Sequence, residues 1–370
     1  MKTVKLGDVC QIVNGGTPKT GVAEYWDGDI LWITPKDLGK IKDRETAHTS
    51  RQLSQAGIDN SSAKVIPAHS VILSTRAPIG HVVINTKPMA FNQGCRGLIP
   101  GDCIIAEYLY YFLKLSKKYL NELGTGTTFR ELSTGALKGV DLPLPSLDEQ
   151  KKIVERLDVA FERISAAEVL MRRNLDNVAA LQKSILHKYL SADDSTHTHR
   201  FADLVHIIKP KLKLQRKQFL SKGLYPIISQ EADFINGYWD DKNNLIGIKK
   251  PVIVWGDHTT VVKYVDFPFV SGADGTKIFE PISSVDVKWL YYYIQYKPVE
   301  KLGYARHYRI LKDSEVEVPP LKTQIESVQS IEAAFRDSEK LAERFVDKLT
   351  KLTELRQSLL SQAFSKENMV

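Results

Sequence analysis

One junction and the long segment that follows it occur twice in this chain of 370 residues. The first copy reads LPLPSLDEQKKI over residues 142–153, and the second reads VPPLKTQI over residues 318–325. Beyond each junction the apolar residues match at an offset of 174, and upstream the aromatic segment 108–112 matches 289–293 at an offset of 181. A repeat of this size constrains the whole fold before any single element is assigned. We therefore predict two copies of one plan, in which a globular part is followed by a helix.

The segments behind the junctions, residues 147–190 and 321–364, have the spacing of long paired helices. Apolar residues recur three or four positions apart with charged residues between them, and this pattern is typical of coiled-coil packing. A helix of about forty residues extends about 60 Å, whereas helices in globular cores average about a dozen residues. We therefore expect the two helices to pair antiparallel. Their predicted seam positions include Ile153, Leu157, Ile164, Val178, Leu181, Ile325, Val328, Ile331, Leu341 and Leu355.

The rest of the chain has the composition of mixed α and β structure. Strands are predicted by β-branched runs at 71–74, 81–84, 251–255 and 261–265. Helices with aromatic faces are predicted at 107–119 and 286–296. The predicted fold class is α+β, with two similar α/β domains joined by two long antiparallel coiled-coil helices in a pseudo-two-fold internal repeat. The predicted boundaries are 1–145 for the first domain, 146–191 for the first helix, 192–200 for a polar linker, 201–318 for the second domain, and 319–370 for the second helix and a C-terminal tail.

Composition restricts the location and the partners of the chain. No apolar run approaches the roughly 18 to 20 residues of a membrane span, and the start MKTVKLGDV lacks the apolar stretch of a signal peptide. Cys10, Cys95 and Cys103 have neither metal-ligand spacing nor an even count, so we expect inert thiols in the cytoplasm. An excess of 51 basic over 44 acidic residues, with a pI near 9.0, mildly favours polyanionic partners such as nucleic acid.

The chain carries no motif that would make it an enzyme by itself. Residues 124–129 read GTGTTF, which resembles a phosphate-binding loop, but no Gly-Lys-Ser/Thr follows. The sequence contains no Gly-x-Ser-x-Gly elbow, no His-Glu-x-x-His and no Asn- or Asp-Pro-Pro-aromatic tetrad. A turn whose amides and hydroxyls touch a DNA phosphate is the better interpretation of GTGTTF. We predict a DNA-reading protein with no catalytic residue, no bound metal and no cofactor of its own.

Basic residues in predicted loops are the candidate DNA contacts. Six cations and no acid stand between Lys209 and Lys222, and such a run neutralises phosphates without choosing a sequence. Residues 304–309 read YARHYR, which sets two arginines among aromatics, and Arg to guanine is the commonest base-edge contact. The full set of predicted contacts is Lys19, Lys36, Arg96, Thr127, Thr128, Arg130, Lys209, Lys211, Lys213, Arg216, Lys217, Arg306, His307 and Arg309. Arg76 is expected to have a structural role in a tight turn.

Several longer segments closely resemble the specificity subunits of type I restriction-modification enzymes. They read GGTPKTGVAEYWDGDILWITPKDL (15–38), VILSTRAPIGHV (71–82), FNQGCRGLIP (91–100), LPLPSLDEQKKIVERL (142–157), LQKSILHKYL (181–190) and LRQSLLSQAF (355–364). The resemblance covers the whole chain in order. It implies two target recognition domains, each reading one half of a bipartite, asymmetric DNA site, joined by two helices that form a spacer of fixed length.

The resemblance also implies partners that carry the chemistry. Two modification subunits would bring S-adenosylmethionine and the adenine-methylating site, and two restriction subunits would add translocation and cleavage that use ATP and Mg. The second domain departs from the pattern, because Lys209-Pro-Lys and Tyr304-Ala-Arg-His stand in place of a Gly-Gly-Thr-Pro phrase and a Gly-x-Gly-Thr-Thr loop. Two alternatives stay open here: a DNA methyltransferase or nuclease in its own right, and a coiled-coil scaffold without DNA binding. We expect Gln150 and Gln324, at the helix starts, to lie near the partner surface.

Overall fold

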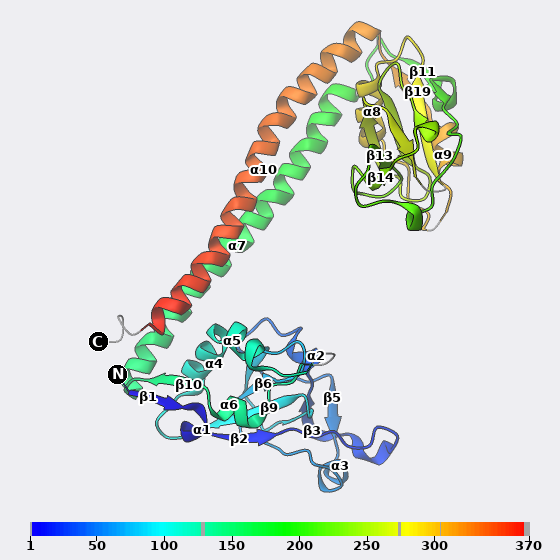
Figure 1. Cartoon of the computed structure of the whole chain (residues 1–370). Helices are drawn as coiled ribbons and strands as arrows, with labels where there is room; N and C mark the ends of the chain where they lie inside the picture. The colour runs from blue at the N-terminus through cyan, green and yellow to red at the C-terminus, as the bar shows by residue number, and fades with distance from the viewer. Residues whose placement is uncertain (1, 127–129, 273–274, 304, 366–370) are drawn as a thin grey trace. The chain divides into compact units, whose positions relative to one another are not determined.

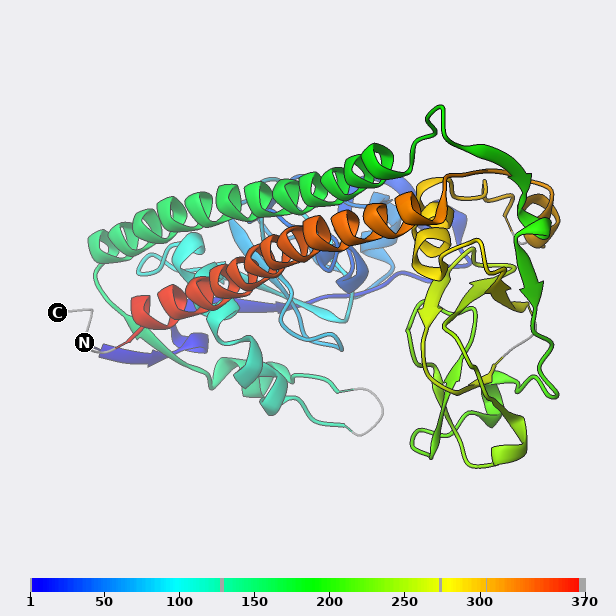
Figure 2. The ribbon, with the colours of Figure 1, turned by 90° about the horizontal axis from the view of Figure 1, so that it is seen from above.

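The computed structural model describes residues 2–126, 130–272, 275–303 and 305–365, and its ribbon is drawn in Figures 1 and 2. The chain separates into two compact units. Unit 1 comprises Met1–Leu170 and Asp347–Val370, and unit 2 comprises Met171–Val346. Each unit therefore holds a globular part together with a portion of both long helices. No helix among the described residues is long and apolar enough to cross a membrane.

The globular part of unit 1 is built on two mixed sheets. Its strands are β1 (Lys2–Lys5), β2 (Cys10–Asn14), β3 (Trp26–Ile33), β4 (Glu45–Thr46), β5 (Arg51–Leu53), β6 (Ser70–Ser74), β7 (Val82–Asn85), β8 (Ala90–Phe91), β9 (Cys95–Pro100) and β10 (Asp141–Leu144). Its helical segments are α1 (Leu6–Val9), η1 (Ala23–Tyr25), α2 (Pro35–Leu38), α3 (Gln55–Asp59), α4 (Ala106–Leu115), α5 (Lys117–Leu123) and α6 (Thr134–Lys138). The larger sheet has the order β2-β9-β6-β7-β4, and the smaller has the order β5-β3-β8. The pair β1 and β10 runs antiparallel.

Strand β6 lies at the centre of the unit 1 core and is buried along its whole length. Because successive side chains of a strand point to opposite faces, Val71 and Leu73 pack in the apolar cluster that contains α4. Ile72 faces the other way and packs in a cluster with Ile33 and Phe91 of the smaller sheet. A strand covered on both faces needs apolar residues without alternation, which explains the continuous run that begins at Val71.

The globular part of unit 2 repeats this topology. Its strands are β11 (His197–Arg200), β12 (Val205–Ile207), β13 (Tyr225–Ile228), β14 (Gly237–Trp239), β15 (Leu245–Ile246), β16 (Val252–Gly256), β17 (Val262–Val265), β18 (Phe269–Ser271), β19 (Thr276–Pro281) and β20 (Glu315–Val318). Its helical segments are η2 (Phe201–Asp203), η3 (Arg216–Gln218), η4 (Lys242–Asn244), α8 (Val287–Tyr296) and α9 (Tyr308–Lys312). The order β12-β19-β16-β17 reproduces β2-β9-β6-β7, and β14-β13-β18 reproduces β5-β3-β8. The predicted internal repeat is therefore confirmed, although β4 of unit 1 and β15 of unit 2 extend their sheets without a counterpart in the other unit.

Most predicted elements of the globular parts are confirmed, and two are corrected. The predicted strands 71–74, 81–84, 251–255 and 261–265 correspond to β6, β7, β16 and β17. The helix predicted at 107–119 is divided at Ser116, whose ψ of 0° departs from helical geometry, into α4 and α5. Residues 197–200, predicted as part of a polar linker, form β11, which pairs antiparallel with β20. All four residues are exposed. The strand therefore forms through backbone pairing alone, and no apolar pattern in the sequence predicts it.

The two predicted long helices are α7 (Leu147–Leu190) and α10 (Leu321–Ala363), with 44 and 43 residues. In unit 1, Arg356 donates to Ser165 Oγ at 3.0 Å. In unit 2, Gln182 donates to Ser338 Oγ at 3.0 Å. Because later residues of one helix face earlier residues of the other in these pairs, the helices run antiparallel, as the green and orange-to-red ribbons of Figure 1 illustrate.

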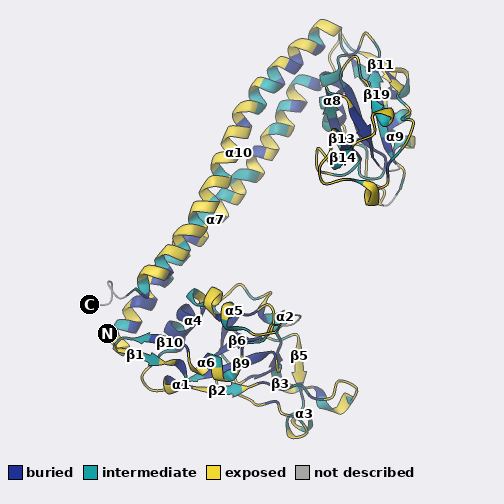
Figure 3. Cartoon of the chain, viewed as in Figure 1, coloured by how far each residue is buried: buried dark blue, intermediate teal, exposed yellow. Residues whose placement is uncertain are grey.

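The seam between the helices is narrower than predicted. Ile153, Leu157 and Ile164 are buried. The seam predictions for four other residues are wrong, because these side chains are 39% to 47% exposed: Leu181, Ile325, Leu341 and Leu355. A pair of helices covers only one stripe of each partner, and Figure 3 accordingly shows both helices exposed along much of their surface.

Candidate nucleic-acid interface

Loops that follow several strands of unit 1 meet at one edge of its sheets. Asn92 Nδ2 donates to Thr17 Oγ1 at 2.8 Å. Thr75 N donates to Gly94 O at 2.8 Å, and Leu132 N donates to Thr75 O at 2.8 Å. The segments joined in this way, together with α2, are named loop cluster 1: residues 15–19, 34–38, 75–77, 92–96 and 130–134. Segments far apart in the sequence thus form one surface.

Three of the predicted contacts in loop cluster 1 are exposed cations: Lys19, Lys36 and Arg130. Lys36 lies on α2, whose start is held because Thr34 N donates to Asp37 Oδ2 at 3.0 Å. Asp37 N in turn donates to Thr34 Oγ1 at 3.3 Å, which completes a capping box. Two further predicted contacts, Thr127 and Thr128, lie outside the described residues.

The structure argues against a direct DNA contact by Arg96. Its side chain is only 11% exposed. Its Nε donates to Thr134 Oγ1 at 2.9 Å, and its Nη1 donates to Gln93 O at 2.9 Å. Glu131 lies 3.5 Å from Arg96 Nη2 and 3.0 Å from Arg76 Nε. Arg96 therefore holds the base of loop cluster 1 together, and Arg76 has the structural role expected of it.

The basic run of unit 2 follows β12, the counterpart of β2. Lys209, Lys211 and Lys217 are exposed and form no ion pair within the described part of the chain. Arg216 is also exposed and has Glu231 Oε1 at 3.6 Å, a distance at which an exposed pair contributes little. Lys213 is half-buried. One buried residue, Leu214, pairs with Gly272 and anchors the run to the sheet.

The predicted contact by His307 is corrected, because its side chain is fully buried. Its Nε2 accepts a hydrogen bond from Leu302 N at 3.0 Å. Its Nδ1, left as the donor, lies 2.9 Å from Asp257 O. Both ring nitrogens therefore have hydrogen-bond partners within the protein. Neighbouring Arg306 and Arg309 are exposed and stay predicted contacts.

The loops of unit 2 converge as those of unit 1 do. His258 has its Nδ1 3.1 Å from Ala305 O, and Thr259 Oγ1 donates to Gln230 O at 2.6 Å. His307 N donates to Asp257 O at 2.8 Å, which is the counterpart of the Leu132 to Thr75 bond. We name these segments loop cluster 2: residues 209–217, 229–231, 257–259 and 305–309.

A buried lysine that the sequence does not reveal holds the loop between β13 and β14. Lys263, on β17, is only 4% exposed. Its Nζ donates to Asn236 Oδ1 at 3.1 Å, and also to the carbonyl oxygen of Asp233. Burial lowers the pKa of Lys263 to about 8, against the opposing effect of nearby Glu231 and Asp233. A lone lysine in a strand gives no sequence signal, because only the folded loop supplies these acceptors.

Stability should depend on pH through Lys263. Since its pKa falls from 10.5 to about 8 on folding, the folded protein releases its proton first as the pH rises, so folding becomes more favourable above pH 8. The wild type should gain about 2 kcal/mol between pH 8 and 10 relative to Lys263→Met. Chemical denaturation of both proteins at pH 8, 9 and 10 measures this difference. A difference that does not change with pH would contradict the expectation.

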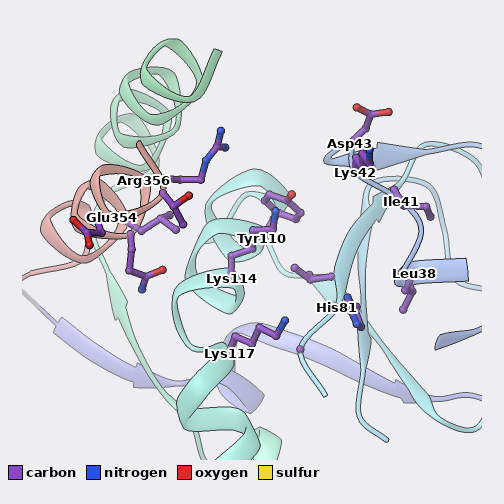
Figure 4. Close-up of a pocket in the computed structure, with 15 residues that line it drawn as sticks. Leu38, Ile41, Lys42, Asp43, His81, Tyr110, Lys114, Lys117, Glu354 and Arg356 are labelled. Carbon is purple, nitrogen blue, oxygen red and sulfur yellow. The ribbon is translucent and has the colours of Figure 1, made fainter. Parts of the chain in front are cut away.

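A cavity of about 560 Å³ in unit 1 lies apart from the predicted contacts. Figure 4 shows it between α4 with α5, the residues near Leu38 and His81, and the end of α10. Cations predominate in its wall, with Lys42, Lys114, Lys117 and Arg356 against Asp43 and Glu354. Burial and the charge of Lys117 lower the pKa of His81.

Potential metal ligands and buried cysteines are two kinds of group that bear on catalysis. The described part of the chain contains no cluster of three or more His, Cys, Asp or Glu side chains that could hold a metal ion. Cys10 and Cys95 are buried free thiols, and burial raises the pKa of each to about 12. Both sulfurs therefore stay protonated at neutral pH and are poor nucleophiles.

Known proteins resemble this chain in sequence. The family model for the type I restriction modification DNA specificity domain matches residues 1–168 and 195–344. The chain is 40% identical over 151 residues to the MjaIX specificity subunit of Methanocaldococcus jannaschii, a match that covers 40% of this chain and 35% of that protein. It is 30% identical over 166 residues to the EcoR124I/EcoR124II specificity subunit of Escherichia coli, a match that covers 41% of this chain and 39% of that protein. These matches span little more than a third of each relative.

The fold also resembles solved structures. A chain from a structure titled as the basis of complex assembly and conformational transition of the type I R-M system superposes with a TM-score of 0.80. That match is 17% identical and covers 99% of this chain and 98% of the other. At this identity the likeness concerns the fold, and it extends over both globular parts and both long helices.

Proposed function

The chain belongs to the type I restriction modification DNA specificity family, and from this premise we propose that its two units each read one half of a bipartite DNA site. Unit 1 would read one half-site through loop cluster 1, and unit 2 would read the other through loop cluster 2. Each cluster would enter a major groove, where the base edges can be distinguished. The chain would act as the DNA-reading component of a larger complex.

The presence of two equivalent loop clusters is the observation that supports this proposal. Both clusters follow the same strands in the same sheet order, and both carry exposed cations that suit phosphate oxygens. Lys19, Lys36 and Arg130 serve this purpose in unit 1, and Lys209, Lys211 and Lys217 serve it in unit 2, whereas the exposed Arg306 would contact base edges. Because the clusters differ in sequence, the two half-sites should differ, unlike the palindrome that a homodimer reads.

The paired helices α7 and α10 would set the number of unread bases between the half-sites. Helices of 44 and 43 residues extend about 65 Å at 1.5 Å per residue. One turn of B-DNA spans about 34 Å, so helices of this length suit half-sites that are one or more turns apart.

The chemistry would come from partner subunits, because the family that matches this chain is described by DNA specificity and not by a catalytic activity. Two modification subunits with S-adenosylmethionine would methylate adenine at the site that this chain selects. Two restriction subunits that use ATP and Mg would translocate and cleave DNA. Access to chromosomal DNA and to these partners would require the cytoplasm.

A genome-wide map of methylated adenine tests the proposal directly. Cells that contain the chain and its modification subunits should show methylation at one asymmetric bipartite motif, and this methylation should disappear when the chain is deleted. Purified chain without partners should transfer no methyl groups to DNA. Strong methyl transfer by the chain alone would favour an enzyme, and the absence of any motif that depends on the chain would favour a scaffold.

A further inference from the structure

Gln150 lies in the first turn of α7, as expected, and its side chain is completely buried within the protein. Its Oε1 accepts a hydrogen bond from Ile105 N at 3.0 Å. Its Nε2 donates to Cys103 O at 2.9 Å and to Pro145 O at 3.0 Å. One side chain thus ties the start of α7 to the backbone before α4 and to the end of β10.

Gln324, in the first turn of α10, repeats these bonds in unit 2. It is also completely buried. Its Oε1 accepts from Asp286 N at 2.7 Å, and its Nε2 donates to Ser284 O at 3.0 Å and to Pro319 O at 2.8 Å. Each of these partner atoms lies at a repeat offset, 181 or 174 residues, from its counterpart in unit 1, although two of the three partner residues differ in type.

An ion pair follows eight residues after each glutamine. In unit 1, Arg44 Nη1 donates to both carboxylate oxygens of Asp158 at 2.7 and 2.8 Å. In unit 2, Lys288 Nζ donates to Glu332 Oε1. These pairs are part-exposed, so the ion pairs alone would hold the helix only weakly.

An aromatic contact follows three residues later. Phe161 meets Tyr111 of α4 at 5.6 Å between ring centroids and 75° between ring planes. Phe335 meets Tyr292 of α8 at 5.7 Å and 84°. With 3.6 residues per turn, positions separated by eight and eleven residues lie within about 80° of the glutamine around the helix. All three contacts therefore use one face of the helix.

We propose that Gln150 and Gln324 are positioning residues that fix the direction of each long helix relative to its globular part, and thereby the gap between half-sites that the protein accepts. This inference rests on the proposed function. Sliding the helix by one residue moves it about 1.5 Å and turns it by about 100°, which would break all three glutamine bonds together. Buried polar groups left without partners are costly, whereas an apolar contact would tolerate such sliding.

The test uses the full chain in complex with its modification subunits. Its substrates are DNAs that keep both half-sites and vary the gap by one or two base pairs on either side. The variants Gln150→Met and Gln324→Met keep the side-chain volume and remove the three bonds. Each should lower the preference for the native gap over neighbouring gaps by about tenfold, while base preferences within the half-sites stay unchanged.

Gln182→Met is the matched control, because Gln182 lies on the same helix but bonds to Ser338 across the helix pair. It should retain the wild-type gap profile. Thermal unfolding monitored by circular dichroism identifies variants that do not fold. If the glutamine variants do not fold, the gap profile is measured with Phe161→Leu and Phe335→Leu instead. These variants weaken the aromatic contact on the same helix face, and we expect a smaller loss of gap preference.

If the glutamine variants fold and keep the wild-type gap profile, the positioning role is overturned. If they do not fold, an unchanged gap profile in the phenylalanine variants overturns it. A wild-type complex that methylates no bipartite site would instead overturn the proposed function itself. The two failures are therefore distinguishable within one experiment.

Discussion

Neutralising Lys209, Lys211, Lys213 and Lys217 to glutamine is expected to weaken binding to DNA of any sequence by about 100- to 1000-fold at physiological salt. Three of these lysines are exposed without an ion pair among the described residues, and Lys213 is half-buried. A cation that neutralises a phosphate releases a counterion, and each contact contributes about 0.9 to the slope of log K against log salt. The variant should therefore show a slope that is flatter by about three, measured by titrating the complex with DNA at several salt concentrations.

A charge-matched control separates the effect of losing phosphate contacts from the effect of lowering the net charge of the protein. Lys322, Lys340, Lys348 and Lys351 are exposed on α10 and belong to neither loop cluster. Changing these four to glutamine lowers the net charge equally and should leave the salt slope nearly unchanged. If the loop variant keeps its slope but selects a different half-site, the basic run reads bases and our assignment of phosphate contacts is wrong.

Removing one heptad from each long helix is expected to change the gap of the recognised site. Seven residues account for about 10 Å of helix, which corresponds to about three base pairs at 3.4 Å each. The helix faces are nearly retained, because seven residues deviate from two full turns by only about 20°. Methylation mapping should therefore report the original half-sites with a different number of unread bases, and an identical gap would contradict a spacer role.

The choice of the heptads depends on the antiparallel register. The sequence repeat pairs residues 162–168 with 336–342, but these segments do not face each other. Ser165 bonds to Arg356, so the segment opposite 162–168 is 353–359. Deleting 162–168 with 353–359 removes facing segments and should preserve the packing. Deleting 162–168 with 336–342 instead shifts one helix by seven residues against the other in the stretch that lies between the two deletion points. The second variant is the control, and it should be less stable to heat than the first.

Much of the fold could be predicted because its signals are local. The two long helices follow from apolar spacing within each segment, and they begin and end within a residue of the predicted positions. Strand β6 follows from a run of β-branched and other apolar residues that is covered on both faces. The doubling of the sheet order follows from matching core positions in the two halves.

The candidate site was less predictable, since a basic residue looks the same in sequence whether it is free or bonded. Lys209 and Arg306 are exposed as expected, but Arg96 and His307 have their donors and acceptors occupied inside the protein. Their partners come from other loops, and His307 bonds to Asp257 across 50 positions of sequence. No local pattern contains that information.

The sequence by itself determined the class of the fold, its duplication and the family of the protein, because periodicity and repeats are properties of the chain alone. Only the tertiary structure decided which polar residues are buried and what they hold. Gln150 and Gln324 illustrate the difference. The repeated junction shows that each glutamine lies at the start of a helix, but their three bonds depend on backbone atoms as far as 47 positions away. Such bonds exist only once the globular part has folded against its helix.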